Sequence, residues 1–167
     1  MTPEKNGGTA VLPGSYDPVT FGHLDIISRA ANAFDNVIVG VVNQPVRKQQ
    51  TVFSAEERVA FIEAEVAEYG NVQVKPFDTL LVDFAREHGA KVIVKGLRAI
   101  SDFEYEFEMN QLNRKMAPEI ESMYMMAAPQ FSFLSSSGVK ELAMFGGDIE
   151  GLVPDPVAAR LQEELKR

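Results

Sequence analysis

Short apolar runs alternate with amphipathic stretches along this chain from Ala10 onward. The first run covers Ala10–Leu12, and the run at Asn36–Val42 is apolar at almost every position, which is typical of a strand buried on both faces of a sheet. Between them, residues 24–34 carry apolar side chains at helical spacing. A helix that joins two such strands predicts a βαβ unit with parallel strands.

The same alternation continues to the C-terminus. Further strands are expected at residues 72–74, 91–94 and 122–127, and further helices at 54–69, 80–88, 103–116, 136–145 and 155–165. Ser54 and Glu57 form a capping-box pattern, and Gly70 and Gly89 are expected to end two of the helices. We therefore predict an α/β fold, namely a Rossmann-like, doubly wound, five-stranded parallel sheet with helices on both faces.

No linker, repeat or low-complexity tract divides the sequence, so residues 10–167 are expected to form a single domain. Residues 1–9 are polar and rich in glycine and proline, which predicts a flexible N-terminal tail. Open parallel sheets bind ligands beyond the carboxyl ends of their strands. The loops that follow Leu12, Val42, Val74, Val94 and Ala127 are therefore expected to surround one site.

Two groups of chemically distinctive residues are expected to have structural roles. His88 lies in the last turn of the helix expected at 80–88, where the helix dipole favours a partial positive charge. Met123, Met125 and Met126 lie in an apolar strand and are expected to fill the core. Neither group enters the candidate site.

Composition narrows the class of partner. The 167 residues are 46% hydrophobic and 24% charged, which is ordinary for a soluble globular protein. Sixteen basic and 24 acidic residues give a net charge of -8, so binding to nucleic acid is not expected. With no cysteine and two histidines, disulfides, thiolate chemistry and a transition-metal site are not predicted. No stretch has the apolar length of a secretory signal or a membrane span, so we expect a cytoplasmic protein without a membrane partner.

The first candidate loop, Pro13–His23, joins a predicted strand to a predicted helix. Gly14 lets the backbone approach an anion, and Ser15 offers a hydroxyl and an N–H group. His23 lies on the first turn of the helix, where its imidazole can donate a hydrogen bond to a phosphoryl oxygen and where the helix dipole favours anions. On these residues alone, a simple turn with His23 as a helix cap is an equal alternative.

The second and third candidate loops carry cations directly after strands. Arg47 and Lys48 lie between Asn43 and Phe53, where a solvated basic turn is the alternative. Lys95 and Arg98 flank a glycine after the strand expected at 91–94, a pattern that favours paired phosphate contacts.

Two acids follow the third loop. Asp102 and Glu106 are one helical turn apart, so they lie on the same face of the next helix. They can orient a nucleoside or hold a magnesium ion, or else form a solvated face that pairs with Arg98.

The fourth candidate segment, Phe131–Ser137, ends in consecutive serines at a predicted helix start. Hydroxyls and unpaired N–H groups there suit a triphosphate, and Lys140 follows one turn later. An N-cap formed by serine alone is the alternative.

These motifs together resemble the nucleotidyltransferases with a histidine-glycine-histidine-type loop and, within that class, the bacterial phosphopantetheine adenylyltransferases. The resemblance extends from Ala10 to Leu165. Its most specific parts are PGSYDPVTFGH at 13–23, KGLR at 95–98, DFEYE at 102–106 and FSFLSSS at 131–137.

The resemblance implies a reaction and its partners. AMP would pass in line from ATP to 4′-phosphopantetheine in the presence of Mg²⁺, giving dephospho-coenzyme A and pyrophosphate without a covalent intermediate. This is the penultimate step of coenzyme A biosynthesis. The resemblance also implies a homohexamer.

Carried over by motif, the resemblance assigns residues to three roles. The catalytic residues would be His23, Lys48 and Arg98. The residues that contact ATP would be Ser15, Tyr16, His23, Gly96, Leu97, Arg98, Glu106, Phe131, Ser132, Phe133, Leu134, Ser135, Ser136 and Ser137. The residues that bind phosphopantetheine would be Ser15, Arg47, Lys48, Leu81 and Lys95. No direct protein ligand to the metal is implied.

The sequence departs from the family pattern at two positions. The second loop is longer than usual and has Arg47 where lysine is expected, so whether Arg47 or Lys48 contacts substrate stays open. Lys140 follows the serines where the wider superfamily often has arginine, which keeps the charge but not the planar fork.

Two rival functions remain. A cytidylyltransferase or a nicotinate-mononucleotide adenylyltransferase would share the phosphate loops, but Leu80, Leu81 and the region of Phe103 favour a long, partly apolar acceptor. A non-catalytic ATP sensor of the same fold would not need a histidine at the reaction centre, and His23 counts against it.

Overall fold

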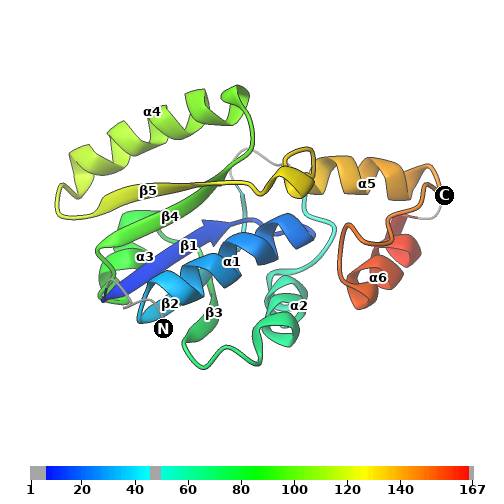
Figure 1. Cartoon of the computed structure of the whole chain (residues 1–167), viewed down its shortest axis with the longest axis horizontal. Helices are drawn as coiled ribbons and strands as arrows, with labels where there is room; N and C mark the ends of the chain where they lie inside the picture. The colour runs from blue at the N-terminus through cyan, green and yellow to red at the C-terminus, as the bar shows by residue number, and fades with distance from the viewer. Residues whose placement is uncertain (1–6, 46–49, 166–167) are drawn as a thin grey trace.

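The computed structural model describes residues 7–45 and 50–165, which form a five-stranded parallel sheet with helices on both faces (Figure 1). The predicted fold class is confirmed. The strands are β1 (Thr9–Gly14), β2 (Asn36–Val42), β3 (Val72–Phe77), β4 (Val92–Leu97) and β5 (Glu121–Met126). The helices are α1 (Phe21–Ala33), α2 (Ala55–Val66), α3 (Leu81–Glu87), α4 (Ile100–Met116), α5 (Ser136–Met144) and α6 (Asp155–Leu165), with a short 3₁₀ turn at Pro129–Phe131.

The strand order is β3-β2-β1-β4-β5, so the direction of winding reverses between β1 and β4. The chain first steps outward from β1 to β2 and β3, and then returns to pair β4 with the free side of β1. In open parallel sheets, ligands bind beyond the carboxyl ends of the strands at this reversal. α5 and α6 lie together beyond that end of the sheet (Figure 1).

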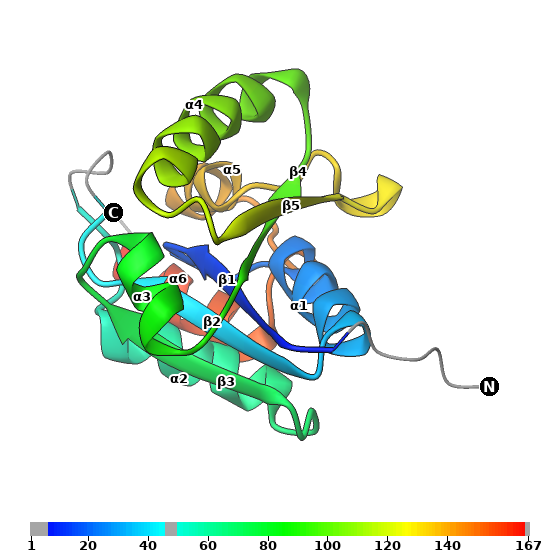
Figure 2. The same ribbon diagram turned by 90° about the vertical axis from the view of Figure 1, so that its left-hand side faces the viewer.

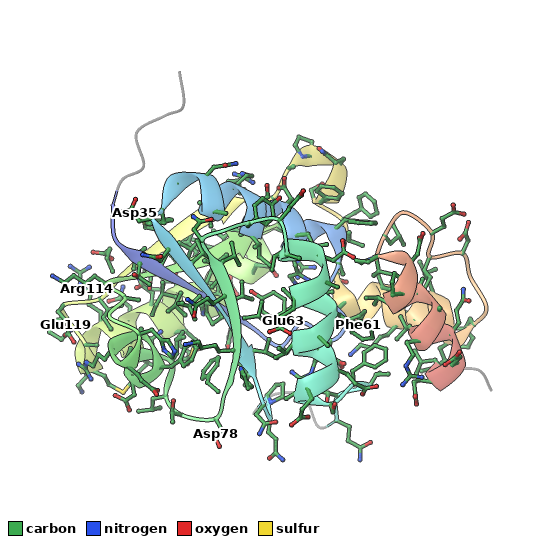
Figure 3. All side chains as sticks on the ribbon, turned by 90° about the horizontal axis from the view of Figure 1, so that it is seen from below. Asp35, Phe61, Glu63, Asp78, Arg114 and Glu119 are labelled. Atoms are coloured by element: carbon green, nitrogen blue, oxygen red, sulfur yellow. The ribbon has the colours of Figure 1, made fainter. Side chains whose placement is uncertain are left out.

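Alternate residues of the central strands enter two separate cores. In β1, Ala10 and Leu12 join the larger cluster with α1, α2, α5 and α6, whereas Val11 joins the smaller cluster under α3. This alternation follows from the two-residue repeat of a strand. Figure 2 shows α3 and α1 on opposite sides of the sheet, and Figure 3 shows α2 beside β3 with Phe61 on the side toward α6.

Several predicted boundaries are wrong: β3 extends to Phe77, and α4 begins at Ile100, before the expected residue 103. The strand expected to end at Val94 continues through Leu97, because β4 stays in register with β5 as far as the pair Leu97 and Met126. At the N-terminus, the flexible tail was expected to include residue 9, but β1 begins at Thr9 and the Gly8 N–H donates to Asp35 Oδ2 at 2.9 Å. Residues 1–6 lie outside the described part of the chain.

The two predicted glycine stops differ in outcome. Gly89 has a φ of +66° after α3, and the His88 ring nitrogen Nδ1 lies 2.9 Å from the Phe84 carbonyl oxygen, so the structural role of His88 is confirmed. Gly70 does not end its helix, because α2 finishes at Val66. The chain there is held instead by Asn71, whose side-chain amide donates to Ala31 O at 2.9 Å and Phe34 O at 3.0 Å.

The expected burial of the β5 methionines is also wrong in part. Met125 packs against the larger core, but Met123 and Met126 are 47% and 63% exposed. β5 is one of the two edge strands, so it has a neighbouring strand on one side only. None of the helices in the described part of the chain has the length and apolarity needed to cross a bilayer.

Gly40 in β2 is expected to tolerate no side chain. A Cβ atom at this position would lie 2.8 Å from Phe84 and 3.0 Å from Phe77, whose rings stack at 4.4 Å. Gly40→Ala should therefore lower the free energy of unfolding by about 1–3 kcal/mol, measured by urea denaturation. Gly70→Ala is the matched control, since nothing lies within 4 Å of its Cβ position. Equal stability of the two variants would contradict the packing argument.

Candidate active site

The imidazole of His23 is fixed by the cap of α1. The Thr20 N–H donates to His23 Nδ1 at 3.0 Å, and the His23 N–H donates to Thr20 Oγ1 at 3.3 Å. Because Nδ1 accepts a hydrogen bond, the neutral ring carries its proton on Nε2. The sequence left a helix cap and a phosphate donor as alternatives for His23. The structure shows the cap. Because the cap occupies Nδ1 as an acceptor, Nε2 carries the proton that a phosphate donor needs.

Tyr16 supports this imidazole from the strand side. Its ring meets the His23 ring edge to face with centroids 5.0 Å apart, and its hydroxyl donates to the Leu12 carbonyl oxygen at 3.0 Å. Burial raises the pKa of the Tyr16 phenol far above its usual range, so Tyr16 does not transfer protons at neutral pH. A Cβ atom at position 14 would lie 2.9 Å from the Tyr16 ring, so the tyrosine ring itself requires Gly14.

Asp17 forms a buried junction, although its place before Pro18 in the first candidate loop indicated only a turn. Its carboxylate is fully buried and accepts hydrogen bonds from the Val52 N–H at 2.9 Å and the Phe53 N–H at 3.0 Å. The Lys140 ammonium, which the sequence suggested for phosphate contact, lies 3.2 Å from Asp17 Oδ2. One indication of this buried acid was present in the sequence, because Asp17 lies between Tyr16 and Pro18, which carry largely apolar side chains.

Arg58 is the second residue that the sequence analysis missed. It is 1% exposed and lies on α2, for which the sequence indicated only the bounds and the capping box. The signal was its position. Arg58 shares the buried stripe of α2 with Ala55, Ile62 and Val66, where an apolar side chain is expected.

The two cations predicted to clamp phosphate are paired with the acids of α4. Arg98 Nε lies 3.1 Å from Asp102 Oδ2, and its Nη1 donates to the Leu134 carbonyl oxygen at 3.1 Å. Lys95 Nζ lies 2.8 Å from Glu106 Oε2, and both of these side chains are 16% exposed. Of the alternatives for Asp102, pairing with Arg98 is what the structure shows. Arg98 also joins the end of β4 to the segment before α5.

Three hydroxyls of the serine segment form hydrogen bonds within the protein. Ser135 caps α5 by accepting from the Gly138 N–H at 3.0 Å, and Ser136 Oγ donates to the Pro18 carbonyl oxygen at 2.8 Å. Ser132 Oγ donates to the Pro129 carbonyl oxygen at 3.0 Å. The predicted N-cap is confirmed for Ser135. Anion binding here would depend chiefly on the first N–H groups of α5 and on the exposed Ser137.

This segment packs on the first turn of α1. A Cβ atom at Gly22 would lie 3.5 Å from Phe131 and 3.8 Å from Leu134, which is ordinary van der Waals distance, so the segment lies directly against this turn. Phe133, in the same segment, is 73% exposed. The β1–α1 loop, the start of α1, the end of β4 and the segment before α5 therefore meet at the carboxyl ends of β1 and β4.

The remaining predicted site residues fall in different places. Gly96 and Leu97 lie at the end of β4. Leu81 begins α3 and packs against the smaller core, which also contains Ile93, two residues before Lys95 in the same strand. Leu81 and Lys95 therefore lie on the face of the sheet opposite α1. Arg47 and Lys48 lie outside the described residues.

Comparisons with known proteins agree over most of the chain. The model of the cytidylyltransferase-like family matches residues 11–142. Phosphopantetheine adenylyltransferase of Clostridium tetani is 55% identical over 148 residues, which cover 89% of this chain and 91% of the relative. The enzyme of the same name from Rubrobacter xylanophilus is 54% identical over 158 residues, covering 95% of each chain.

A solved structure shows the same fold at low identity. The crystal structure of a putative nicotinate-nucleotide adenylyltransferase from Vibrio parahaemolyticus superposes with a TM-score of 0.69 at 16% identity, covering 95% of this chain and 96% of the other. This likeness concerns the fold alone.

Proposed function

Because this chain belongs to the cytidylyltransferase-like family and, within it, to the phosphopantetheine adenylyltransferases, we propose that it transfers AMP from ATP to 4′-phosphopantetheine, giving dephospho-coenzyme A and pyrophosphate. The observation that carries this proposal is identity above one half with the phosphopantetheine enzymes along nearly the whole chain. The rival acceptor, nicotinate mononucleotide, is supported only by a likeness of fold.

The proposed chemistry needs positioning more than proton transfer. The attacking group of phosphopantetheine is a phosphate oxygen that is already anionic, so no base has to remove a proton from it. The site must bring two anions together and stabilise the charge that develops on the α-phosphate and the leaving pyrophosphate. A Nε2–H donor on His23, the cation of Arg98 and the N-terminus of α5 are suited to this work. We assign the in-line transfer to these groups, with Lys48 as a further cation.

The two substrates would bind on the two sides of the β1–β4 junction. ATP would contact the β1–α1 loop, Gly96, Leu97, Arg98, Glu106 and the segment 131–137. Phosphopantetheine would lie toward the α3 face, where Leu81 offers an apolar contact and Lys95 a cation. Ser15, in the loop between the two regions, would contact both substrates.

Mg²⁺ would enter with ATP. In the described part of the chain, the acidic and histidine side chains form no group of three or more that could hold a metal ion. Mg²⁺ is commonly bound through substrate phosphates with few protein ligands. The ion would neutralise phosphate charge, and the protein residues would bind and orient the nucleotide around it. We further place the enzyme in the cytoplasm, where ATP is available.

The homohexamer implied by the family would bury the exposed apolar face of α4 and β5. Phe103 and Phe107 are each 54% exposed and stack on one another at 5.9 Å, and Met126 on β5 is 63% exposed. Exposed apolar side chains gathered in this way favour an interface. We expect sedimentation to give a hexamer for the wild-type protein and smaller species for Phe107→Glu. A monomeric wild-type protein would contradict the proposed assembly.

Pyrophosphate release separates the proposed function from its rivals. The protein would be incubated with ATP, Mg²⁺ and, in separate reactions, 4′-phosphopantetheine, nicotinate mononucleotide or a phosphorylated cytidylyl acceptor with CTP. The proposal requires pyrophosphate and dephospho-coenzyme A with phosphopantetheine alone. Turnover with another acceptor would support that rival, and ATP binding without any turnover would support a sensor.

A further inference from the structure

Arg58 is a buried cation. In the described part of the chain, the hydrogen bonds of its guanidinium group all go to backbone carbonyl oxygens. Arg58 lies on α2 between Ala55 and Ile62 and is 1% exposed. A charged side chain in such a position is costly unless its donors are satisfied. The packing of α2 itself does not explain an arginine here, because an apolar side chain would fill the buried stripe of this helix.

The guanidinium joins three segments at the edge of the candidate site. Nη1 donates to the carbonyl oxygens of Ser15 at 2.8 Å and Val42 at 2.7 Å, and Nη2 donates to Asn43 O at 2.9 Å. Nε donates to Phe53 O at 3.1 Å and also reaches Ser54 O at 3.2 Å. One side chain thus fixes the β1–α1 loop, the end of β2 and the start of α2 to each other.

Asp17 strengthens this arrangement from the same loop. Its carboxylate accepts from the N–H groups of Val52 and Phe53, just before α2. Asn43 is therefore linked through Arg58 to Ser15, and Val52 is linked directly to Asp17. Residues of the β1–α1 loop hold both of these positions, and His23 lies at the other end of that loop.

We propose that Arg58 is a positioning residue for AMP transfer, which sets the backbone at Ser15 relative to the carboxyl end of β2 and so aligns the acceptor with the nucleotide. This inference rests on the proposed function. Arg58 is buried and would act through Ser15 without touching substrate. The planar fork of arginine is needed, because a lysine ammonium cannot reach oxygens on three segments in the same geometry.

The test compares Arg58→Met and Arg58→Lys with Ile62→Ala. Ile62 is fully buried one turn later on the same stripe of α2 and belongs to the core, so its truncation destabilises the helix without changing the bonds to Ser15. The variants would be assayed at a temperature where circular dichroism shows each to be folded, with ATP and phosphopantetheine varied separately.

A misplacement of reacting groups by about 1 Å costs roughly 10²-fold in rate. We therefore expect Arg58→Met to lose about 10²-fold in kcat per folded molecule, with a smaller change in the KM for ATP. Arg58→Lys should lose about tenfold or more, because it keeps the charge but not the fork. Ile62→Ala should keep the wild-type kcat per folded molecule.

The outcomes are distinguishable. If Arg58→Met does not fold, Arg58→Lys decides the question. An Arg58 variant with the same kcat per folded molecule as Ile62→Ala would overturn the positioning role while the proposed function stands. A wild-type protein that forms no dephospho-coenzyme A would overturn the proposed function, and this inference with it.

Discussion

His23→Ala is expected to lower kcat by about 10²–10³-fold, the usual effect of removing one donor aimed at a transition state. The affinity for ATP should change far less, because the nucleotide would keep its other proposed contacts from the β1–α1 loop, β4, α4 and the segment before α5. The reason lies in the tautomer. The bond from Thr20 to Nδ1 leaves the ring proton on Nε2, where it can donate to a phosphoryl oxygen as charge develops. Steady-state turnover and ATP titration measure the two quantities separately.

A second variant separates the helix cap from the donor. Glutamine is a usual partner at the N3 position of a capping box, so His23→Gln should retain the cap of α1 while losing the imidazole. We expect its thermal stability to match that of the wild type and its kcat to fall as far as in His23→Ala. His88→Ala controls for the loss of a histidine elsewhere, since His88 lies at the end of α3. Equal losses of kcat and ATP affinity in His23→Ala would contradict the assigned role.

Asp17→Ala is expected to lower the free energy of unfolding by about 3 kcal/mol, the cost of breaking a buried pair on one side. The truncation leaves the N–H groups of Val52 and Phe53 and the Lys140 ammonium without the acceptor they share in the folded protein. Because Asp17 is fully buried, the groups that lose it do not readily regain a partner from solvent. Chemical denaturation of both proteins measures the difference.

The control for Asp17 is an acid whose pair is more exposed. Asp25 lies 3.2 Å from Arg29 on the surface of α1, and such pairs contribute between 0 and about 1 kcal/mol. Asp25→Ala should therefore leave stability nearly unchanged. If Asp17→Ala were no more destabilising than Asp25→Ala, the hydrogen bonds and ion pair of Asp17 would not contribute to the stability of the protein as proposed.

The fold could be predicted because its strongest signals are local. A parallel strand buried on both faces is apolar at consecutive positions, and the run at Asn36–Val42 matches β2. The capping box at Ser54 and Glu57 likewise marked the start of α2. The predicted ends of elements were wrong where residues far apart in sequence set them. β4 extends through Lys95 and Gly96 because β5 pairs with it, and nothing near these residues in sequence indicates that pairing.

The candidate site divides in the same way. Its loops were predictable, since each motif directly follows a strand and parallel strands share one carboxyl edge. The partners of its charges were only partly predictable. The pair of Arg98 and Asp102 spans one helical turn and was foreseen as an alternative, but the bonds from Arg58 to Ser15 and from Asp17 to Val52 join residues far apart in sequence. Such bonds exist only once the chain has folded.

The pairing of Lys95 with Glu106 and of Arg98 with Asp102 has a consequence for selectivity. Each cation already has a counter-ion. The binding free energy of an arriving anion is therefore only the difference between its own attraction to the cation and that of the carboxylate it displaces. A single inorganic phosphate ion gains little from such an exchange. A nucleoside triphosphate that engages Arg98, the Nε2–H of His23 and the N-terminus of α5 at once adds several small gains. The free enzyme would thus resist occupation by the simple phosphate salts of the cell while remaining ready for its nucleotide.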